Sequence, residues 1–501
     1  MRGAGQTSVF NSVVLTVTMQ WTNRFIGFVS TLILARLLVP DDFGLIAMGT
    51  VVVGLVDMLL DLGVNVALIQ NRNAAPAHYN TAWTIRLAQA AIAALIVFFA
   101  APFFAQYFHD PRVELVLQLM AAGMLIGGLE NIGVITFQKE MRFGLDFRFA
   151  FFKRIFGFIV TIVAAWLLRS YWALVIGALA GRCFGVFLSY HMHPMRPRFS
   201  IEKLKELFLI SQWMLAKSIG SYLNGNLDKV LVGRRINTTM LGGYTLADEI
   251  SAMPSSEVLA PLNRVLFPAF VQAKHDLTKL KELFLQAQAV QCLLAFPAAI
   301  GAMLVAKEAV FVLLGEKWLF VVPFVQVLSM VHLVNAIITS GGYVMLTLGK
   351  VHYLTIFVWV QVAFFAFMTI LIYPDSTALQ IAWLRILTVY LGLFLAIYLL
   401  MRSLKNVRLL NFIRSVFRPF VGVIMMTIGV LPIAEILDYP PVATLLLKIV
   451  IGLIIYPVVI LTLWWIAGRP PGAESYLLGK IETFLDSAKK SPWVSRFLPK
   501  G

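Results

Sequence analysis

Long apolar runs separated by short polar breaks occupy almost the whole chain. The first two, residues 13–39 and 43–69, lie on either side of the break Pro40-Asp41-Asp42. Each exceeds the roughly 20 residues that a helix needs to cross a bilayer. More runs follow with short connections, which predicts an all-α polytopic membrane protein of about fourteen transmembrane helices without an extramembrane domain. The predicted spans are 13–39, 43–69, 80–106, 113–137, 146–168, 171–190, 208–233, 241–270, 283–306, 320–348, 351–373, 377–401, 419–437 and 442–467.

Polar residues within the second run recur at helical spacing. Thr50, Gly54, Asp57, Asp61 and Asn65 follow one another at steps of three or four. Positions that far apart lie on one face of a helix. An ionisable residue within the membrane is costly and normally faces a bundle interior or an aqueous cavity. The sequence therefore predicts a polar path through a helical bundle.

Arg24 is the leading candidate for a cation in this path, because it lies near the middle of the first span beside Gln20 and Asn23. The seventh span carries a similar polar stripe that includes Lys217 and Asp228. Arginine holds a phosphate through a bidentate fork, and lysine holds it as a point charge. These residue types favour a substrate with a phosphate-bearing headgroup. We expect four cations to line its cavity: Arg24, Arg86, Lys217 and Arg154.

Four other charged residues fit two roles each. Asp57 and Asp61 are i, i+4 neighbours, so their like charges disfavour joint ionisation. They either carry a coupling proton or sodium ion, or pair with an arginine of the first or third span. Asp228 and Lys229 in the seventh span are likewise candidates for coupling or for a structural ion pair.

The composition excludes a soluble globular protein, because 60% of the residues are hydrophobic, 13% are charged and the mean hydropathy is +0.84. The formal net charge of +16 has a topological origin. If the N-terminus is cytoplasmic, about twenty-four of the 41 Lys and Arg lie on that side and about seven on the other. The positive-inside rule therefore predicts that both termini are cytoplasmic. This assignment removes the main support for nucleic-acid binding.

The sequence lacks the motifs of common catalytic and metal sites. Cys183 and Cys292 lie inside apolar runs, which indicates neither a disulfide framework nor a zinc site. There is no glycine-rich phosphate loop, nucleophile motif or pair of catalytic carboxylates. We therefore expect no cofactor, no metal and no enzymatic activity.

A sparse internal repeat divides the chain. Residues 35–36 and 43–44 line up with residues 233–234 and 241–242 at an offset of 198, with Arg36 and Gly44 identical to Arg234 and Gly242. Six spans separate the copies, so both enter the membrane from the same side. The repeat predicts two pseudo-symmetric six-helix lobes around a central cleft, which rock to expose the cleft to each side in turn. The predicted divisions are 1–200 for the N-terminal lobe, 201–410 for the C-terminal lobe, 411–467 for two extra transmembrane helices and 468–501 for a basic cytoplasmic tail.

Several segments carry a family resemblance: residues 34–44 (LARLLVPDDFG), Tyr171–Val175, Asn226–Lys229, Leu266–Ala269 and Leu314–Trp318. In them the chain resembles the polysaccharide-transporter (Wzx-type) oligosaccharide flippase family of the multidrug/oligosaccharidyl-lipid/polysaccharide exporter superfamily. The resemblance extends over almost the whole chain.

This resemblance implies a flippase of the bacterial cytoplasmic (inner) membrane. Its substrate would be an undecaprenyl-diphosphate-linked oligosaccharide, moved from the inner to the outer leaflet by alternating access. The product would enter lipopolysaccharide, capsule or exopolysaccharide synthesis, with a polysaccharide polymerase and export machinery as partners. The resemblance also implies a cationic central cavity in which Arg24 meets the diphosphate while the tail stays in the membrane lipid. Asp228 and Lys229 belong to a family motif that can instead serve packing between lobes.

Two other functions stay open. A cation-coupled drug antiporter of the same superfamily would be expected to use an acidic cavity, and the excess of cations argues against it. A membrane glycosyltransferase or polysaccharide polymerase usually has large external loops, which this chain lacks. For the flippase, we expect Arg24→Ala to abolish polysaccharide export while membrane insertion stays intact.

Overall fold

The computed structural model describes residues 25–61, 63–71, 73–207, 212–404, 409–432, 440–470 and 472–479, together with Thr22. Within these ranges the regular structure is helical throughout, as the apolar runs predict. The chain forms two compact units. Unit 1 comprises Met1–Leu246, Leu313–Val321 and Val358–Leu384, and unit 2 comprises Ala247–Val312, Val322–Phe357 and Arg385–Gly501.

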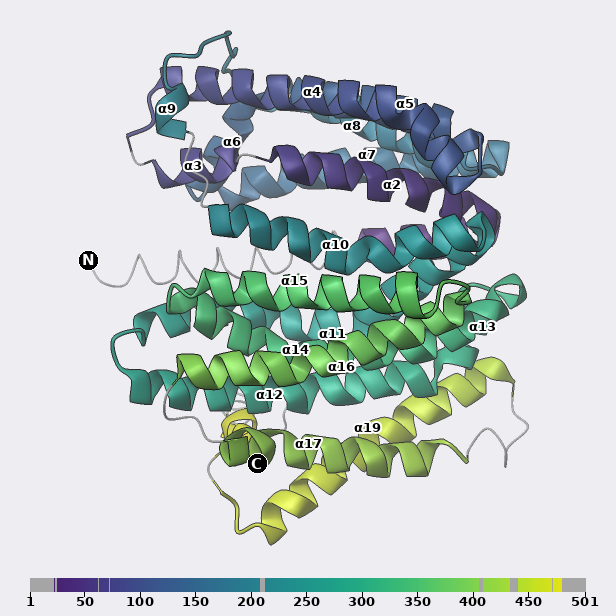
Figure 1. Ribbon diagram of the computed structural model, residues 1–501, viewed down its shortest axis with the longest axis vertical. Coiled ribbons are helices and arrows are strands. Elements are labelled where there is room, and N and C mark those ends of the chain that lie inside the picture. The colour runs from purple at the N-terminus through teal and green to yellow at the C-terminus, as the bar shows by residue number, and fades with distance from the viewer. Residues whose placement is uncertain are drawn as a thin grey trace, which may run out of the picture. The chain divides into compact units, whose positions relative to one another are not determined.

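Unit 1 contains the amino-terminal helices (Figure 1). They are Phe25–Leu37, α2 (Pro40–Leu60), α3 (Val64–Gln70), α4 (Pro76–Phe108), α5 (Arg112–Gly128), η1 (Ile132–Val134), α6 (Ile135–Lys139), α7 (Phe143–Leu168), α8 (Trp172–Met192), α9 (Leu204–Leu207), α10 (Gln212–Arg235), the start of α11 (Thr238–Gln272) and η2 (Glu316–Val321). α4 packs along α5, α7 packs along α8, and α10 packs against α2. Gly157 and Gly181 allow α7 and α8 to approach, since a methyl group on either would lie 3.4 Å from the Cα atom of the other.

The predicted break Pro40-Asp41-Asp42 forms the first turn of α2. Proline suits this position because the first helical N–H has no partner within the helix. Asp42 Oδ2 accepts a hydrogen bond from Val39 N at 3.1 Å, and its Oδ1 accepts one from Tyr171 N at 2.8 Å. One buried carboxylate therefore joins the start of α2 to the start of α8.

The predicted span 43–69 is interrupted. α2 ends at Leu60 and α3 begins at Val64. Between them Gly63 adopts a φ of 64°, a left-handed conformation that glycine tolerates best. Gly63 N donates a hydrogen bond to Asp61 Oδ1 at 2.9 Å, which stabilises the break. The prediction of one continuous helix is wrong here because the sequence pattern does not register a local turn at the glycine.

The predicted span 113–137 also breaks. α5 and the helical stretch Ile132–Lys139 are bent by 66° relative to each other. The buried Asn131 holds this bend, since its Oδ1 accepts from Gly133 N at 2.9 Å and its Nδ2 donates to Met195 O at 2.7 Å. Glu130 lies within the bend and is therefore held by the backbone on both sides.

Unit 2 contains the later helices (Figure 1). They are the rest of α11, α12 (Leu277–Leu304), α13 (Ala306–Leu313), α14 (Val322–Thr347), the start of α15 (Val351–Phe367), most of α16 (Ala378–Ser403), α17 (Leu409–Val430) and α19 (Pro441–Ile466). α12 packs against α14 and α17, and α17 packs against α19. Lys448 Nζ of α19 lies 2.7 Å from Glu308 Oε1 of α13, and both side chains are buried.

Ten of the described helices are long and apolar enough to cross a membrane, and the bent pair containing α5 makes an eleventh. Phe25–Leu37 is apolar but shorter, because the first part of the predicted span 13–39 lies outside the described residues. α10 and α11 fill the seventh and eighth predicted spans but fall outside this apolar group. The protein is therefore a multi-pass membrane protein, as predicted. The count of fourteen is not confirmed, and the lobe boundaries and central cleft stay predictions.

Candidate functional site

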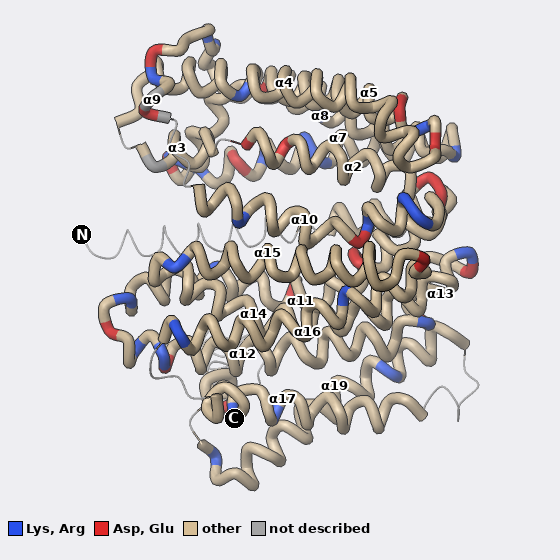
Figure 2. The backbone as a smooth tube through the Cα atoms, viewed as in Figure 1, with Lys and Arg blue, Asp and Glu red and all other residues tan. Residues whose placement is uncertain are grey.

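A charged cavity of about 630 Å³ lies within unit 1 among α2, α4, α5, α7 and α8. Both helix breaks contribute to its wall, and Figure 2 shows acidic positions on the part of α2 that leads to α3. Irregular backbone inside a helical membrane protein is tolerated where it lines a water-filled cavity. The breaks and the charges therefore mark one polar site. Its charged lining residues are Arg86, Lys153, Arg182, Asp57, Asp61 and Glu130.

Glu130 is the centre of the site's ion-pair network. Lys153 Nζ lies 3.1 Å from each of its carboxylate oxygens, and Arg86 Nη2 lies 3.1 Å from Oε2. Glu130 is only 5% exposed. A buried carboxylate is strongly destabilising unless a cation pairs with it, and Glu130 pairs with two cations. The three side chains together keep a formal charge of +1.

Arg182 of α8 is the third cation of the cavity, and it is half-buried. It makes no hydrogen bond or ion pair with any residue in the described part of the chain. The side chain lies across Gly123 of α5, where an added methyl group would come within 3.1 Å of Arg182 Nη1. Its guanidinium donors are therefore available to a ligand in the cavity.

The acids of α2 balance these cations. Asp57 is exposed in the cavity wall, and Asp61 uses Oδ1 to accept from Gly63 N. Three cations and three acids give the described lining no net charge, in contrast to the expected cationic cavity. Arg24, the leading predicted cation, lies outside the described residues. Within the described ranges, no group of three or more His, Cys, Asp or Glu side chains is arranged to hold a metal ion.

Two other predicted cations, Arg154 and Lys217, lie outside the wall of this cavity. Arg154 follows Lys153 on α7 but is not part of the cavity wall, because successive helical residues point in different directions. It is exposed and extends to Gly27 of the helix Phe25–Leu37. Lys217 lies half-buried on α10, without a hydrogen bond or ion pair to any described residue. Of the three predicted cations that the structure describes, Arg86 alone lines the cavity.

Asp228 forms buried hydrogen bonds within unit 1. Its Oδ2 accepts a hydrogen bond from Tyr244 Oη at 2.9 Å, and its Oδ1 accepts from Lys229 N at 2.9 Å. Asp228 is 4% exposed and Tyr244 is fully buried. This contact joins α10 to α11. It places Asp228 among buried packing residues and away from the wall of the charged cavity.

Gln89 is a polar residue of the cavity wall that the sequence-based prediction did not include. Gln89 Nε2 donates to Leu60 O, the last carbonyl of α2, and so holds the α2 break against α4. A signal was available, because Gln89 lies three residues after Arg86 and shares its helix face. Its partner, the Leu60 carbonyl, could not be predicted, because the helix break that exposes this carbonyl is seen only in the tertiary structure.

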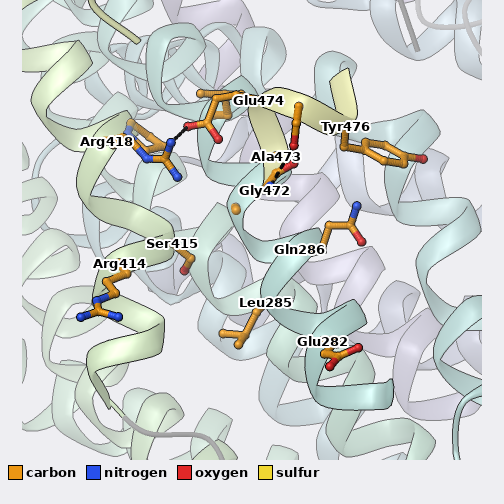
Figure 3. A pocket seen from close by; sticks show the side chains of 14 residues that line it. Glu282, Leu285, Gln286, Arg414, Ser415, Arg418, Gly472, Ala473, Glu474 and Tyr476 are labelled. Atoms are coloured by element: carbon orange, nitrogen blue, oxygen red, sulfur yellow. Dashed lines mark hydrogen bonds and ion pairs between the residues drawn. The ribbon is translucent and has the colours of Figure 1, made fainter. Parts of the chain in front are cut away.

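Unit 2 has its own cavity of about 800 Å³, between α12, α17 and the segment Gly472–Tyr476 (Figure 3). Arg418 Nη1 lies 3.0 Å from Glu474 Oε1 there, and Glu474 is 5% exposed. This ion pair ties α17 to the chain that follows α19. Arg418 and Glu474 therefore neutralise each other at that end of the cavity.

Two relatives carry informative descriptions. The lipopolysaccharide biosynthesis protein WzxC of Escherichia coli (strain K12) is 25% identical over 334 residues, which cover 65% of this chain and 67% of the relative. The succinoglycan biosynthesis transport protein ExoT of Rhizobium meliloti (strain 1021) is 24% identical over 334 residues, with the same coverage of 65% and 67%.

Among solved structures, the lipid II flippase MurJ in an inward closed conformation matches with a TM-score of 0.72. The match covers 91% of this chain and 100% of that chain at 11% identity, and it shows a shared fold. A family model described as polysaccharide biosynthesis protein matches residues 33–323, which is more than half of the chain. The predicted resemblance to Wzx-type transporters is confirmed, and the chain belongs to this polysaccharide biosynthesis protein family.

Proposed function

We propose that this protein flips an undecaprenyl-diphosphate-linked oligosaccharide from the inner to the outer leaflet of the bacterial cytoplasmic membrane. Family membership supports polysaccharide synthesis as the setting. The descriptions of ExoT as a transport protein and of MurJ as a flippase support translocation as the task. The product then serves lipopolysaccharide, capsule or exopolysaccharide synthesis, where a polymerase and export machinery take it up.

The observation that carries the proposal is Arg182, which makes no hydrogen bond or ion pair with the described residues, beside two cations that share Glu130. A diphosphate and its sugars cannot cross hydrocarbon unaided, because charged and polar groups lose their hydration there. A diphosphate esterified at both ends carries two negative charges. Arg86, Lys153 and Arg182 against Glu130 give a formal +2, and the two aspartates of the α2 end, Asp57 and Asp61, bring the whole lining to zero before the substrate enters. Arginine forks and the lysine ammonium supply the charge-assisted hydrogen bonds.

The acids and amides of the cavity suit the sugar part of this substrate. Asp57 and Asp61 are acceptors for sugar hydroxyl groups, and Gln89 and Asn65 offer both donors and acceptors. The lipid tail needs no place in a polar cavity, because it stays in the bilayer. Sugar selectivity in this arrangement depends on the shape of the cavity around these side chains.

The cations lie inside the predicted spans. With a cytoplasmic N-terminus, α4 and α7 both run outward from the cytoplasmic side. Arg86 and Lys153 lie six and seven residues after the first residues of the predicted spans 80–106 and 146–168, which is about 10 Å along the axis. That depth is about a third of a hydrocarbon core of about 30 Å. In this scheme a ligand headgroup held there has left the cytoplasmic interface and is on its way to the outer leaflet.

Alternating access completes the proposed cycle. Two lobes expose the headgroup first to the cytoplasmic side and then to the external side. No covalent bond of the substrate breaks, so we propose no enzymatic activity. A proton or sodium gradient acting through Asp57 and Asp61 supplies the driving force in this scheme.

The test is Arg182→Gln in cells whose own flippase gene is deleted. We expect loss of surface polysaccharide and accumulation of the lipid-linked intermediate on the cytoplasmic side. Arg148→Gln is the matched control, because Arg148 is an exposed residue of α7 outside the cavity wall. Full export by a stably inserted Arg182→Gln protein contradicts the proposed site.

The three acids of the cavity favour a cation-coupled small-molecule antiporter as the second candidate. That function requires Asp57 and Asp61 and leaves Arg182 dispensable. Cells expressing Asp57→Asn would then lose drug efflux, while Arg182→Gln cells would keep it. Export of a lipid-linked sugar that depends on Arg182 decides for the flippase.

A further inference from the structure

We infer that Glu130 is the residue that sets the release of the diphosphate, because it competes with the substrate for the same two cations. The inference rests on the proposed function. The N–H donors of Arg86 and Lys153 already bind the Glu130 carboxylate. Phosphate oxygens that approach these two cations must compete with Glu130. Substrate binding therefore exchanges one anionic partner for another.

The backbone holds Glu130 in place for this exchange. Asn131, the next residue, is fully buried and uses its side chain on Gly133 N and Met195 O. Its own backbone N donates to Ser189 Oγ at 3.0 Å. Glu130 thus lies on an anchored bend, and its carboxylate cannot follow the cations away. The bend keeps the competing anion next to the bound headgroup throughout the cycle.

Competition of this kind limits affinity, which transport requires. A site must bind well enough to load its substrate and weakly enough to release it. Three cations without a counter-ion would hold a diphosphate through several charge-assisted hydrogen bonds, each stronger than a neutral one. Glu130 lowers that affinity and receives Arg86 and Lys153 again when the headgroup leaves. Glu130 is therefore a positioning residue for Arg86 and Lys153, and its negative charge lowers the affinity for the diphosphate.

Glu130→Gln tests this role, because the amide keeps the size and one acceptor oxygen but removes the charge. The probe is farnesyl-diphosphate-linked N-acetylglucosamine, added to the purified full-length protein for binding and to proteoliposomes for flipping. We expect binding to become roughly tenfold tighter and the maximal flipping rate to fall by a similar factor. Glu130→Asp, which keeps the charge, restores most of the rate.

Glu140→Gln is the matched control. Glu140 also pairs with an arginine, since its Oε2 lies 3.0 Å from Arg142 Nε, but it is half exposed and outside the cavity wall. Unchanged or weaker binding by Glu130→Gln overturns the inference, since a merely structural role lowers binding and rate together. The proposed function then still stands if the wild type binds the probe and Arg182→Gln does not. A wild type that fails to bind the probe contradicts the proposed function itself.

Discussion

Lys153 Nζ lies 3.1 Å from both carboxylate oxygens of Glu130, across the gap between α7 and the bend that follows α5. Arg86 Nη2 approaches the same carboxylate from α4. Three helical segments thus meet at one buried acid. Because an unpaired buried charge is strongly destabilising, this contact contributes to the fold of unit 1 as well as to the proposed site.

Lys153→Met should lower the free energy of unfolding by about 1–3 kcal/mol, because Glu130 loses its contacts to Nζ. Denaturant unfolding of the purified full-length protein in detergent measures the change. The double variant Lys153→Met/Glu130→Gln should be more stable than Lys153→Met, since a neutral amide replaces the buried carboxylate that has lost a cation. An additive loss in the double variant would show that the pair does not interact.

Tyr244→Phe should destabilise the protein by about 1–3 kcal/mol, because Asp228 Oδ2 then loses a donor in a buried environment. Thermal unfolding followed by circular dichroism measures the effect. Tyr398→Phe is a fair control, since Tyr398 is 58% exposed on α16. Equal stability of the two variants would contradict a structural role for the Asp228 contact.

Lys448→Met should cost about 3–5 kcal/mol, because it leaves the buried Glu308 carboxylate without its cation. Replacing both residues by leucine removes the charge and the unpaired acid together. We expect Glu308→Leu/Lys448→Leu to recover most of the loss, as buried ion pairs often exchange for apolar residues at little cost. Unfolding that is no easier in Lys448→Met than in the wild type would count against a stabilising pair.

Acidification should destabilise the turn of chain that follows α8, at His193 and Met195. Burial lowers the pKa of His193 below its usual 6.5, the negative charge of Glu140 raises it in part, and the positive charges of Arg142 and Arg196 lower it further. Met195 N donates a hydrogen bond to His193 Nδ1 at 3.2 Å. Nδ1 can accept this bond only while it carries no proton. Since the pKa is lower in the folded state, the stability contribution is present above about pH 6.5 and is lost as the pH falls through the folded value.

The measurement is the melting temperature of the full-length protein between pH 7.5 and 5. His193→Asn keeps an acceptor for Met195 N but does not titrate in this window. We expect its melting temperature to fall less over this range than that of the wild type. Parallel curves for both proteins would assign the pH dependence to other groups.

Much of the fold could be read from the sequence, because the constraint is local. A helix satisfies its own backbone hydrogen bonds, so a long apolar run must be helical in lipid. The start of α2 was predicted three residues late, because Pro40-Asp41-Asp42 was predicted as a break, although Pro40 and Asp42 have clear helix-start preferences. The breaks at Gly63 and Glu130 were not predicted, because apolar residues continue on both sides of them.

The sequence by itself determined that the chain is a helical multi-pass membrane protein of this family, and it marked Arg86, Asp57 and Asp61 as polar residues with no place in lipid. Only the tertiary structure decided that Lys153 joins Arg86 at Glu130 while its neighbour Arg154 lies elsewhere. Adjacent helical residues point in directions about 100° apart, and which one meets a partner depends on how the helices pack. The spacing of residues along one helix determines which of them share a face. The residues that this face contacts belong to segments distant in sequence.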